Sequence, residues 1–238
     1  MKSVEFRWKE GIRVKDCGDG EAESGMGKLS PARGEAGSGQ PRQGPAGDEP
    51  GAMDRTHAQL GNPRLTGLAP FADDASSLLI LGSMPGEASL LAGQYYGHPR
   101  NHFWRLLYAL LDGGEPDADY KARVQFALSR GVALWDVLRT CEREGSLDAA
   151  IRRPEANDFA AMFGMHPRIR HVFFNGSAAA ELFRRHVRPK LPAGDGRTYR
   201  TLPSSSPARA MSFEAKRDAW QPVRDAWLEL GSPGGSRR

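Results

Sequence analysis

The sequence Ser77-Leu78-Leu79-Ile80-Leu81-Gly82 is a continuous apolar run that ends in a glycine, and Ser83-Met84-Pro85-Gly86 follows it directly. A short apolar run with no polar face is typical of a strand in a parallel sheet, because helices cover such a strand on both sides. The glycine and proline residues after it favour a tight turn, whose backbone N–H groups can point at a ligand. The sequence therefore predicts a buried strand that leads into a binding turn.

Similar runs follow along the chain. Further strands are predicted at 132–138, 170–175 and 199–202, and helices are predicted at 101–111, 120–129, 155–164, from 177 and from 212. Residues 83–100 form a predicted loop, and Pro222 should kink or split the last helix. Strands that alternate with helices imply βαβ units. We therefore expect an α/β fold: a three-layer α/β/α arrangement around a central, mainly parallel four-stranded sheet.

The composition changes near residue 60. Residues 1–60 contain 11 Gly and 4 Pro but only two aromatic residues, and they have no apolar periodicity. Such a segment buries too little surface to offset the entropy of ordering it. We expect a disordered low-complexity tail over 1–60, one domain over 61–232, and a flexible C-terminus over 233–238. Met53 lies just before the domain, so one hypothesis is that residues 1–52 are not part of the native protein.

Charge and cysteine content restrict the class of protein. The net charge is −1 for residues 1–60 and +5 for the remainder, which permits a polyanionic partner without requiring one. No apolar run is long enough for a membrane span, and we expect no signal peptide. The two cysteines, Cys17 and Cys141, lie in different parts of the chain, which favours a reducing compartment over a disulfide scaffold. The expected location is the cytoplasm, in association with the nucleoid.

Several common sites have no support in the sequence. There is no GxxxxGK[ST], GxGxxG or GxSxG motif, and the six histidines lack the spacing of metal ligands. We expect no metal and no organic cofactor. Ligands of such folds bind outside the carboxyl ends of the strands. The segments expected at that edge are 82–86, Asp136, Asn175 and 203–207.

Three motifs lie in or beside these segments. They are Gly82-Ser83-Met84-Pro85-Gly86, then Gln94-Tyr95-Tyr96-Gly97-His98-Pro99-Arg100-Asn101-His102-Phe103-Trp104, then Leu202-Pro203-Ser204-Ser205-Ser206-Pro207-Ala208-Arg209. The tyrosines offer a stacking surface. The serine hydroxyls, the backbone amides and the arginine suit a phosphate backbone.

Together these motifs resemble the uracil-DNA glycosylase superfamily, and most closely its hypoxanthine-DNA (deoxyinosine) glycosylase branch. The resemblance covers roughly residues 65–230 and also includes the Leu-Trp-Asp-Val, Gly-Ser-Leu-Asp and Asn-Gly stretches at 134–137, 145–148 and 175–176. It implies a monofunctional enzyme that flips a deaminated nucleotide out of DNA and hydrolyses its N-glycosidic bond. The expected base is hypoxanthine, and the expected route is base excision repair.

The resemblance also implies roles for individual residues. Asn101 and Asp136 would be catalytic. Met84 stands where most relatives have an Asp or Asn that positions water, and since Met cannot do this, Asn101 would hold the water. The expected base-binding residues are Gly82, Ser83, Met84, Tyr96 and Asn175, with Tyr95 as an alternative to Tyr96. The expected phosphate-binding residues are Ser204, Ser205, Ser206 and Arg209. Relatives insert an apolar wedge, often Leu, after the serine motif, where this chain has Pro207-Ala208-Arg209.

Other interpretations remain open at this point. Asn101 is also a suitable helix N-cap, and Asp136 and Asn175 could simply form turns. The base could be uracil or mismatched thymine, and Met84 keeps open a catalytically inactive DNA-binding module. The expected partner is DNA that contains a deaminated base, bound by a monomer that can hand its product to an abasic-site endonuclease.

Overall fold

A computed structural model describes residues 64–231. The predicted tail over 1–60 and the predicted flexible end over 233–238 lie outside these described residues. The hypothesis that residues 1–52 are not part of the native protein also concerns residues outside this range.

The centre of the fold is a four-stranded sheet in the order β3-β2-β6-β7, in which all three neighbouring pairs are parallel. The strands are β2 (Leu78–Gly82), β3 (Val132–Asp136), β6 (His171–Asn175) and β7 (Thr198–Leu202). Every residue of β2 and β3 is buried, as the unbroken apolar runs predict. The predicted four-stranded parallel sheet is confirmed.

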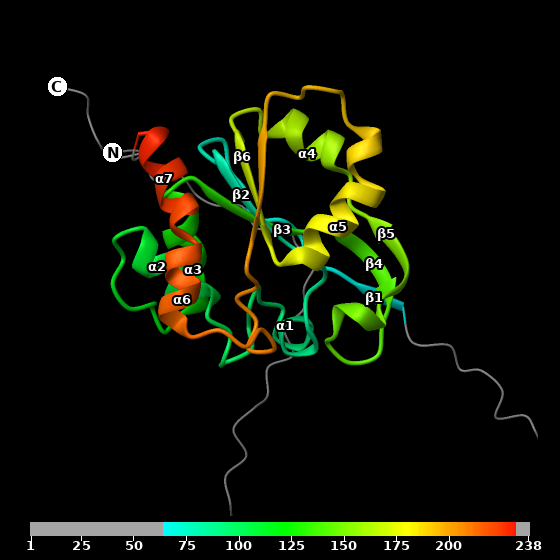
Figure 1. Ribbon diagram of the computed structural model, residues 1–238, viewed down its shortest axis with the longest axis horizontal. Helices are drawn as coiled ribbons and strands as arrows, with labels where there is room; N and C mark the ends of the chain where they lie inside the picture. Colours follow the sequence, from blue (N-terminus) through cyan, green and yellow to red (C-terminus); the bar gives the residue numbers. More distant parts are fainter. Residues whose placement is uncertain (1–63, 232–238) are drawn as a thin grey trace, which may run out of the picture. The chain divides into compact units, whose positions relative to one another are not determined.

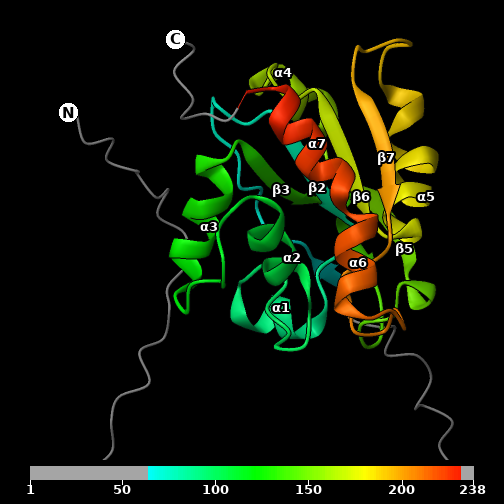
Figure 2. The same ribbon diagram turned by 60° about the vertical axis from the view of Figure 1, so that its left-hand side comes forward.

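Helices cover both faces of this sheet, as Figure 2 shows. One side holds α4 (Phe159–Met165) and α5 (Ser177–His186), and the other holds α2 (Phe103–Leu110), α3 (Tyr120–Ser129), α6 (Phe213–Ala219) and α7 (Gln221–Glu229). Two short 3₁₀ helices, η1 (Asp148–Ala150) and η2 (Arg188–Lys190), lie in connections. The predicted three-layer α/β/α arrangement is therefore confirmed.

The sequence patterns missed a second sheet. It is antiparallel, in the order β1-β4-β5, and consists of β1 (Arg64–Thr66), β4 (Leu138–Glu142) and β5 (Arg152–Ala156). The apolar run 132–138 crosses between the two sheets at Val137, whose N–H donates to the Gly82 carbonyl. The expected helix over 155–164 begins only at Phe159, because residues 152–156 pair with β4. Pro154 is tolerated in β5 because this strand is at an edge.

Two other elements differ from or refine the prediction. The expected loop 83–100 contains a short helix, α1 (Glu87–Ala92). The last helix divides at Trp220 into α6 and α7, with Pro222 in the first turn of α7, as predicted. Trp220 is fully buried and its Nε1–H donates to the Pro203 carbonyl at 2.8 Å, so this break is fixed against the end of β7.

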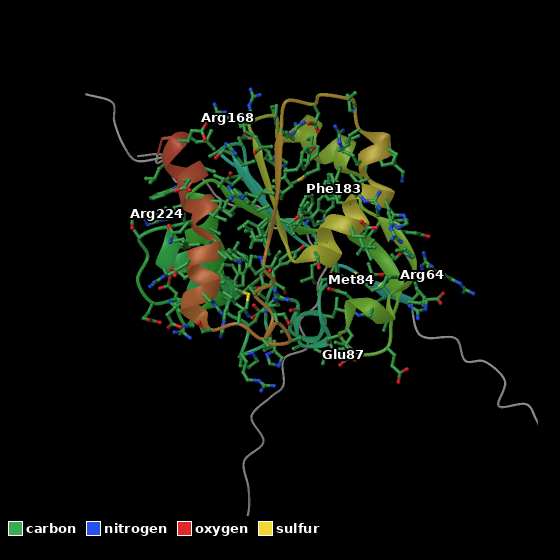
Figure 3. The ribbon with its side chains drawn as sticks, viewed as in Figure 1. Arg64, Met84, Glu87, Arg168, Phe183 and Arg224 are labelled. Carbon is green, nitrogen blue, oxygen red and sulfur yellow. The ribbon has the colours of Figure 1, made fainter. Side chains whose placement is uncertain are left out.

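The carboxyl ends of the four parallel strands lie at one edge of the sheet. Figure 1 shows α1 at this edge, and the labelled side chains of Met84 and Glu87 lie there in Figure 3. The segments that follow β2, β3, β6 and β7 converge there, as the fold rule predicts.

Candidate functional site

A cavity of about 460 Å³ opens at this edge of the sheet. It is lined by ten of the eleven residues that the sequence assigned to the site: Gly82, Ser83, Met84, Tyr96, Asn101, Asp136, Asn175, Ser204, Ser205 and Ser206. Arg209 is the exception: its side chain is exposed, and the residue is not part of the cavity lining. Segments up to about 120 residues apart in the sequence therefore form one site.

Gly82 and Asp136 make the closest approach in the cavity wall. They are register partners at the ends of β2 and β3. A Cβ atom at position 82 would lie 2.3 Å from Asp136 Oδ1, which no side chain can accept. Glycine at position 82 therefore leaves the space that the Asp136 carboxyl group occupies, and a larger residue would force that group to move.

The carboxyl group of Asp136 is buried and incompletely hydrogen-bonded. The residue is 3% exposed, and Oδ2 has no hydrogen-bond partner among the residues that the structure describes. Burial, and to a lesser extent the nearby charge of Asp148, raises the pKa of Asp136 to about 7, although Arg143 opposes this shift. A carboxyl group with this pKa can donate or accept a proton near neutral pH.

The turn after β2 is fixed by the loop after β4. Ser83 Oγ donates to Asp148 Oδ1 at 2.6 Å. The buried guanidinium of Arg143 donates from Nη2 to the Pro85 carbonyl and from Nε to the Gly145 carbonyl at 2.9 Å. These contacts place the positive charge of Arg143 beneath the turn, where it can favour negative charge in the cavity.

Tyr96 has a strained backbone and a well-packed ring. Its backbone φ is 55°, a left-handed value that is uncommon outside glycine. One face of the ring stacks on Phe103 at a centroid distance of 3.6 Å and an interplanar angle of 15°. Burial raises the pKa of its hydroxyl, whose oxygen lacks a hydrogen-bond partner within 64–231. With one face covered by Phe103 and the residue on the cavity lining, Tyr96 is a suitable base-stacking side chain.

Tyr95 also lines the cavity, but its side chain packs differently. It is 2% exposed, and its hydroxyl donates to the carbonyls of Leu68 and Ala69. Its ring lies edge-on to Phe71. The hydroxyl and ring of Tyr95 are thus used in packing, so Tyr96 is the better placed of the two for base stacking, and both assignments stay predictions.

Asn101 lies where it can both cap a helix and face the cavity. Its Oδ1 accepts a hydrogen bond from the Phe103 N–H at 3.0 Å, so the side chain satisfies a free amide at the start of α2. His102 rather than Asn101 is the boundary residue of that helix. Asn101 also lines the cavity. Because a carbonyl oxygen has two lone pairs, Oδ1 retains one for a water molecule while it caps the helix.

Met84 forms an apolar part of the wall. The residue is 5% exposed and belongs to the hydrophobic core. Its thioether cannot activate water, so the turn contributes backbone groups and shape at this position.

The segment Pro203–Pro207, called here the serine loop, is held from three sides. The Asn175 side chain donates to Ser205 Oγ at 2.8 Å and accepts from the Ser205 N–H at 2.7 Å. Lys216 Nζ donates to the Ser206 carbonyl at 2.8 Å, and the His102 N–H donates to the Ser205 carbonyl at 3.1 Å. The loop is therefore rigid and has a buried ammonium group beneath it.

These hydrogen bonds bear on the predicted roles of Ser205 and Asn175. Ser205 is 0% exposed and its hydroxyl accepts from Asn175, so the predicted phosphate contact of its side chain would use the hydroxyl proton. Asn175 both donates to and accepts from Ser205, which helps to position the loop; it also lines the cavity, and its base contact stays a prediction. Ser204 and Ser206 are only partly buried and stay available, although each hydroxyl accepts a local backbone N–H.

Sequence reasoning gave no role to one part of the wall. The turn between β4 and η1 contributes Ser146, Leu147 and Asp148. The signal was present, because these residues form the Gly-Ser-Leu-Asp stretch of the resemblance. The rest of the lining consists of Pro85, Gly86, the first residues of α1, Tyr95, His98, Pro207 and Ala208.

Within residues 64–231, no three His, Cys, Asp or Glu side chains gather in a way that could hold a metal ion. In the same range, no helix has both the length and the apolar character needed to cross a membrane.

Comparisons with known proteins agree with this geometry. The model of the uracil DNA glycosylase superfamily matches residues 69–231. A protein named hypoxanthine DNA glycosylase from Methanosarcina barkeri is 36% identical over 154 residues, which is 65% of this chain and 94% of the relative. A protein of the same name from Methanosarcina acetivorans is 34% identical over 66% of this chain and 96% of the relative.

A solved structure supports the same assignment. It is a solution NMR structure from Methanosarcina acetivorans, of a protein provisionally named uracil DNA glycosylase. The TM-score is 0.60 at 32% identity, over 70% of this chain and 99% of the other. By its family match, its relatives and its fold, the chain belongs to the uracil DNA glycosylase superfamily.

Proposed function

We propose that this protein is a monofunctional DNA glycosylase that removes hypoxanthine from deoxyinosine in DNA, as a step of base excision repair. The observation that carries the proposal is the cavity itself, which joins a stacking ring, a buried carboxyl group and a water-holding amide at one edge of the sheet. The names of the two Methanosarcina relatives support hypoxanthine as the base.

The cavity suits a single flipped base. Its volume lies within the range of roughly 300–1,000 Å³ that is usual for small-molecule sites. The base enters beside the Tyr96 ring, and backbone groups of residues 82–84 contact its edge. The partly buried Ser204 and Ser206 contact the phosphates beside the lesion.

The reaction breaks the bond between C1′ and the base nitrogen. The electron pair leaves with the base, and the sugar passes through a cation-like state. Asp136 in its neutral form donates a hydrogen bond to the departing base, and its pKa of about 7 makes that form available near neutral pH. A water molecule held by Asn101 Oδ1 then adds to C1′, and its proton passes to the departed base anion, so the products are the neutral base and the C1′ hydroxyl of the abasic site.

No lysine takes part in this scheme. Lys216 contacts the serine loop, but its Nζ donates to the Ser205 and Ser206 carbonyls and the residue is not part of the cavity lining. A Schiff base with the sugar is therefore not expected. The product is an abasic site, which a separate endonuclease would process, and the protein would act as a monomer.

The test uses duplexes that contain one inosine or one uracil, followed by alkaline cleavage. Strand breakage at inosine but not at uracil is expected. Breakage at uracil alone would mean that uracil, and not hypoxanthine, is the base removed. Breakage at neither base with retained DNA binding would favour a catalytically inactive DNA-binding module. That module is the main alternative, because Met84 stands where most relatives have a water-positioning Asp or Asn.

Replacement of Asn101 by Ala separates catalysis from folding. We expect single-turnover excision to fall by a factor on the order of 10² or more, as for loss of one transition-state contact. DNA affinity should change little. Asn101→Asp is the matched control for the cap, because its carboxylate can still accept from the Phe103 N–H. Equal losses of binding and turnover in Asn101→Ala would make this residue structural only.

A further inference from the structure

Arg143 is a buried positive charge that has no part in the proposed reaction. It directly follows β4, is 2% exposed, and forms no salt bridge with any residue of 64–231. Its Nη1 atom also lacks a hydrogen-bond partner in the part of the chain that the structure describes. Charged side chains are rarely buried unless they are paired, because removing a charge from water is costly. A purely structural role therefore leaves the charge of Arg143 unexplained.

The guanidinium group of Arg143 joins two walls of the cavity. Nη2 donates to the Pro85 carbonyl in the turn after β2, and Nε donates to the Gly145 carbonyl at 2.9 Å in the turn after β4. Two residues of the cavity lining join the same turns, since Ser83 Oγ donates to Asp148 Oδ1 at 2.6 Å. One positive and one negative side chain thus hold the same pair of turns together.

Both of these charges act on the carboxyl group of Asp136. Pro85 belongs to the turn that follows Gly82, and a Cβ atom at position 82 would meet the carboxyl oxygen of Asp136. Burial raises the pKa of Asp136 most, the negative charge of Asp148 raises it further, and the positive charge of Arg143 lowers it. The two charges that fix the turns therefore have opposite effects on the same buried acid.

Three tyrosine hydroxyl groups are the other titratable groups that interact with Asp136. They belong to Tyr95, Tyr96 and Tyr120. Burial is the main cause that raises the pKa of each hydroxyl above its usual value, so all three are uncharged near neutral pH. Within the described residues, the charges at Asp136 are thus those of Arg143 and Asp148.

We infer that Arg143 is a positioning residue for base excision: it holds the cavity wall beside Asp136 in place and, through its charge, fixes the pH range in which Asp136 is protonated. A proton donor works best when its pKa is close to the working pH, because it is then both protonated and sufficiently acidic. The inference rests on the proposed function, in which neutral Asp136 donates to the departing base.

The direction of the effect follows from the two charges. Neutral Asp136 is the active form, so the rate is high below its pKa of about 7 and falls as the pH rises through that value. Loss of the Arg143 charge favours the neutral form and moves this fall to higher pH, whereas loss of the Asp148 charge moves it to lower pH. A residue that only supports the fold would lower the rate equally at every pH.

The first test measures single-turnover excision from an inosine duplex on both sides of neutral pH. Arg143→Gln should move the midpoint of the fall upward by on the order of one pH unit. It should also lower the rate on the acidic side severalfold, because the remaining acid is a weaker donor. Asp148→Asn, whose amide oxygen can still accept from Ser83, should move the midpoint downward.

Two further variants separate charge from support of the fold. Arg143→Lys keeps the charge but cannot hold both carbonyls, so it should keep the wild-type midpoint and slow excision at every pH. The matched control is Arg139→Gln, which removes an exposed arginine of β4 paired with Glu155 and outside the cavity lining, and should change neither quantity. An unmoved midpoint in Arg143→Gln, or the same upward shift in Arg143→Lys, would refute the inference.

A second test does not depend on catalysis. Aspartate carboxyl carbons are labelled with ¹³C in the free protein, and the signal that is lost in Asp136→Asn is followed by NMR as the pH changes. Its midpoint should lie near pH 7 in the wild type, higher in Arg143→Gln and lower in Asp148→Asn. Equal midpoints in the wild type and Arg143→Gln would overturn the inference. If the protein excised no base but the midpoints moved as expected, the proposed function would fail and the control of Asp136 by Arg143 would stand.

The remaining variants decide the matter if Arg143→Gln does not fold. Asp148→Asn must then lower the NMR midpoint, and Arg143→Lys must keep it while excision slows. A midpoint that Asp148→Asn leaves unchanged would show that the charges at these turns do not control Asp136. Full activity of Arg143→Lys would show that the paired contacts of Arg143 do not support the reaction.

Discussion

Asp136 is the residue whose environment differs most from that of a surface carboxylate. Burial raises its pKa to about 7, with a smaller contribution from Asp148. Between about pH 4 and pH 7 the folded protein therefore holds a proton that the unfolded chain, with an Asp pKa of about 3.9, releases. It follows that the stability of the fold decreases as the pH rises through this window.

Asp136→Asn removes this titration and keeps the shape of the neutral side chain. We expect it to raise the free energy of unfolding at pH 8 by on the order of a few kcal/mol, because one pKa unit corresponds to about 1.4 kcal/mol. At pH 4 the gain should be close to zero. Urea unfolding at several pH values measures the difference, and a gain of the same size at both ends would contradict a raised pKa.

Gly82 is the second residue whose identity depends on its neighbour. Gly82→Ala places a Cβ atom 2.3 Å from Asp136 Oδ1, so Asp136 must move. We expect a loss of about 1–3 kcal/mol of stability, as for other overpacked sites, together with most of the excision activity.

Gly164→Ala is the control for this change. Gly164 lies in α4 with no heavy atom within 4 Å of an added Cβ, so the substitution should stabilise the fold by about 0.5–1 kcal/mol and leave activity unchanged. Thermal melts and single-turnover rates distinguish the two variants. Similar behaviour of both would mean that the close approach to Asp136 has no consequence.

Contacts between elements fix the shape of the serine loop. β6 reaches it through Asn175, α2 through the His102 amide, and α6 through Lys216. Lys216 is fully buried, and desolvation lowers the pKa of its ammonium group. A buried ammonium group that donates to two loop carbonyls holds the loop close to α6.

Lys216→Met tests this connection. The carbonyls of Ser205 and Ser206 lose a donor, which should cost about 1–3 kcal/mol of stability. Affinity for a duplex with an abasic-site analogue should fall, because the loop is no longer held in place and a positive charge is lost. Lys190→Met, which removes an exposed lysine of η2, should change neither property. Unchanged melting and affinity in Lys216→Met would exclude this positioning role.

The elements that sequence patterns missed are those that depend on partners far away in the chain. Arg152–Ala156 forms β5 because it pairs with β4. Leu138–Glu142 forms β4 in the second sheet, although it directly follows a strand of the central sheet. Neither segment has the alternation of apolar and polar residues that identifies a strand locally. By contrast, Pro222 marks the break between α6 and α7 through its own covalent structure.

At the scale of the whole molecule, the described residues contain a complete set of layers. The buried core that they form extends from Leu78 to Trp227. We therefore predict that a chain beginning at Met53 keeps the melting temperature within about 2 °C and the excision rate within about twofold. Differential scanning calorimetry and single-turnover assays of the two chains measure this. A clear fall in either quantity would show that residues 1–52 contribute to the fold or to DNA binding.

The sequence by itself determined the parallel sheet, the two helical layers and the segments at the carboxyl edge. The reason is that unbroken apolar runs, prolines and glycines determine the local conformation of the segments in which they occur. Only the tertiary structure decided what the side chains at that edge do. It buried the Asp136 carboxyl group beside Gly82 and joined the side chains of Asn175 and Ser205 by a hydrogen bond. It also placed Leu147 in the lining of the cavity. These roles depend on contacts between segments tens of residues apart, which packing creates and no local pattern encodes.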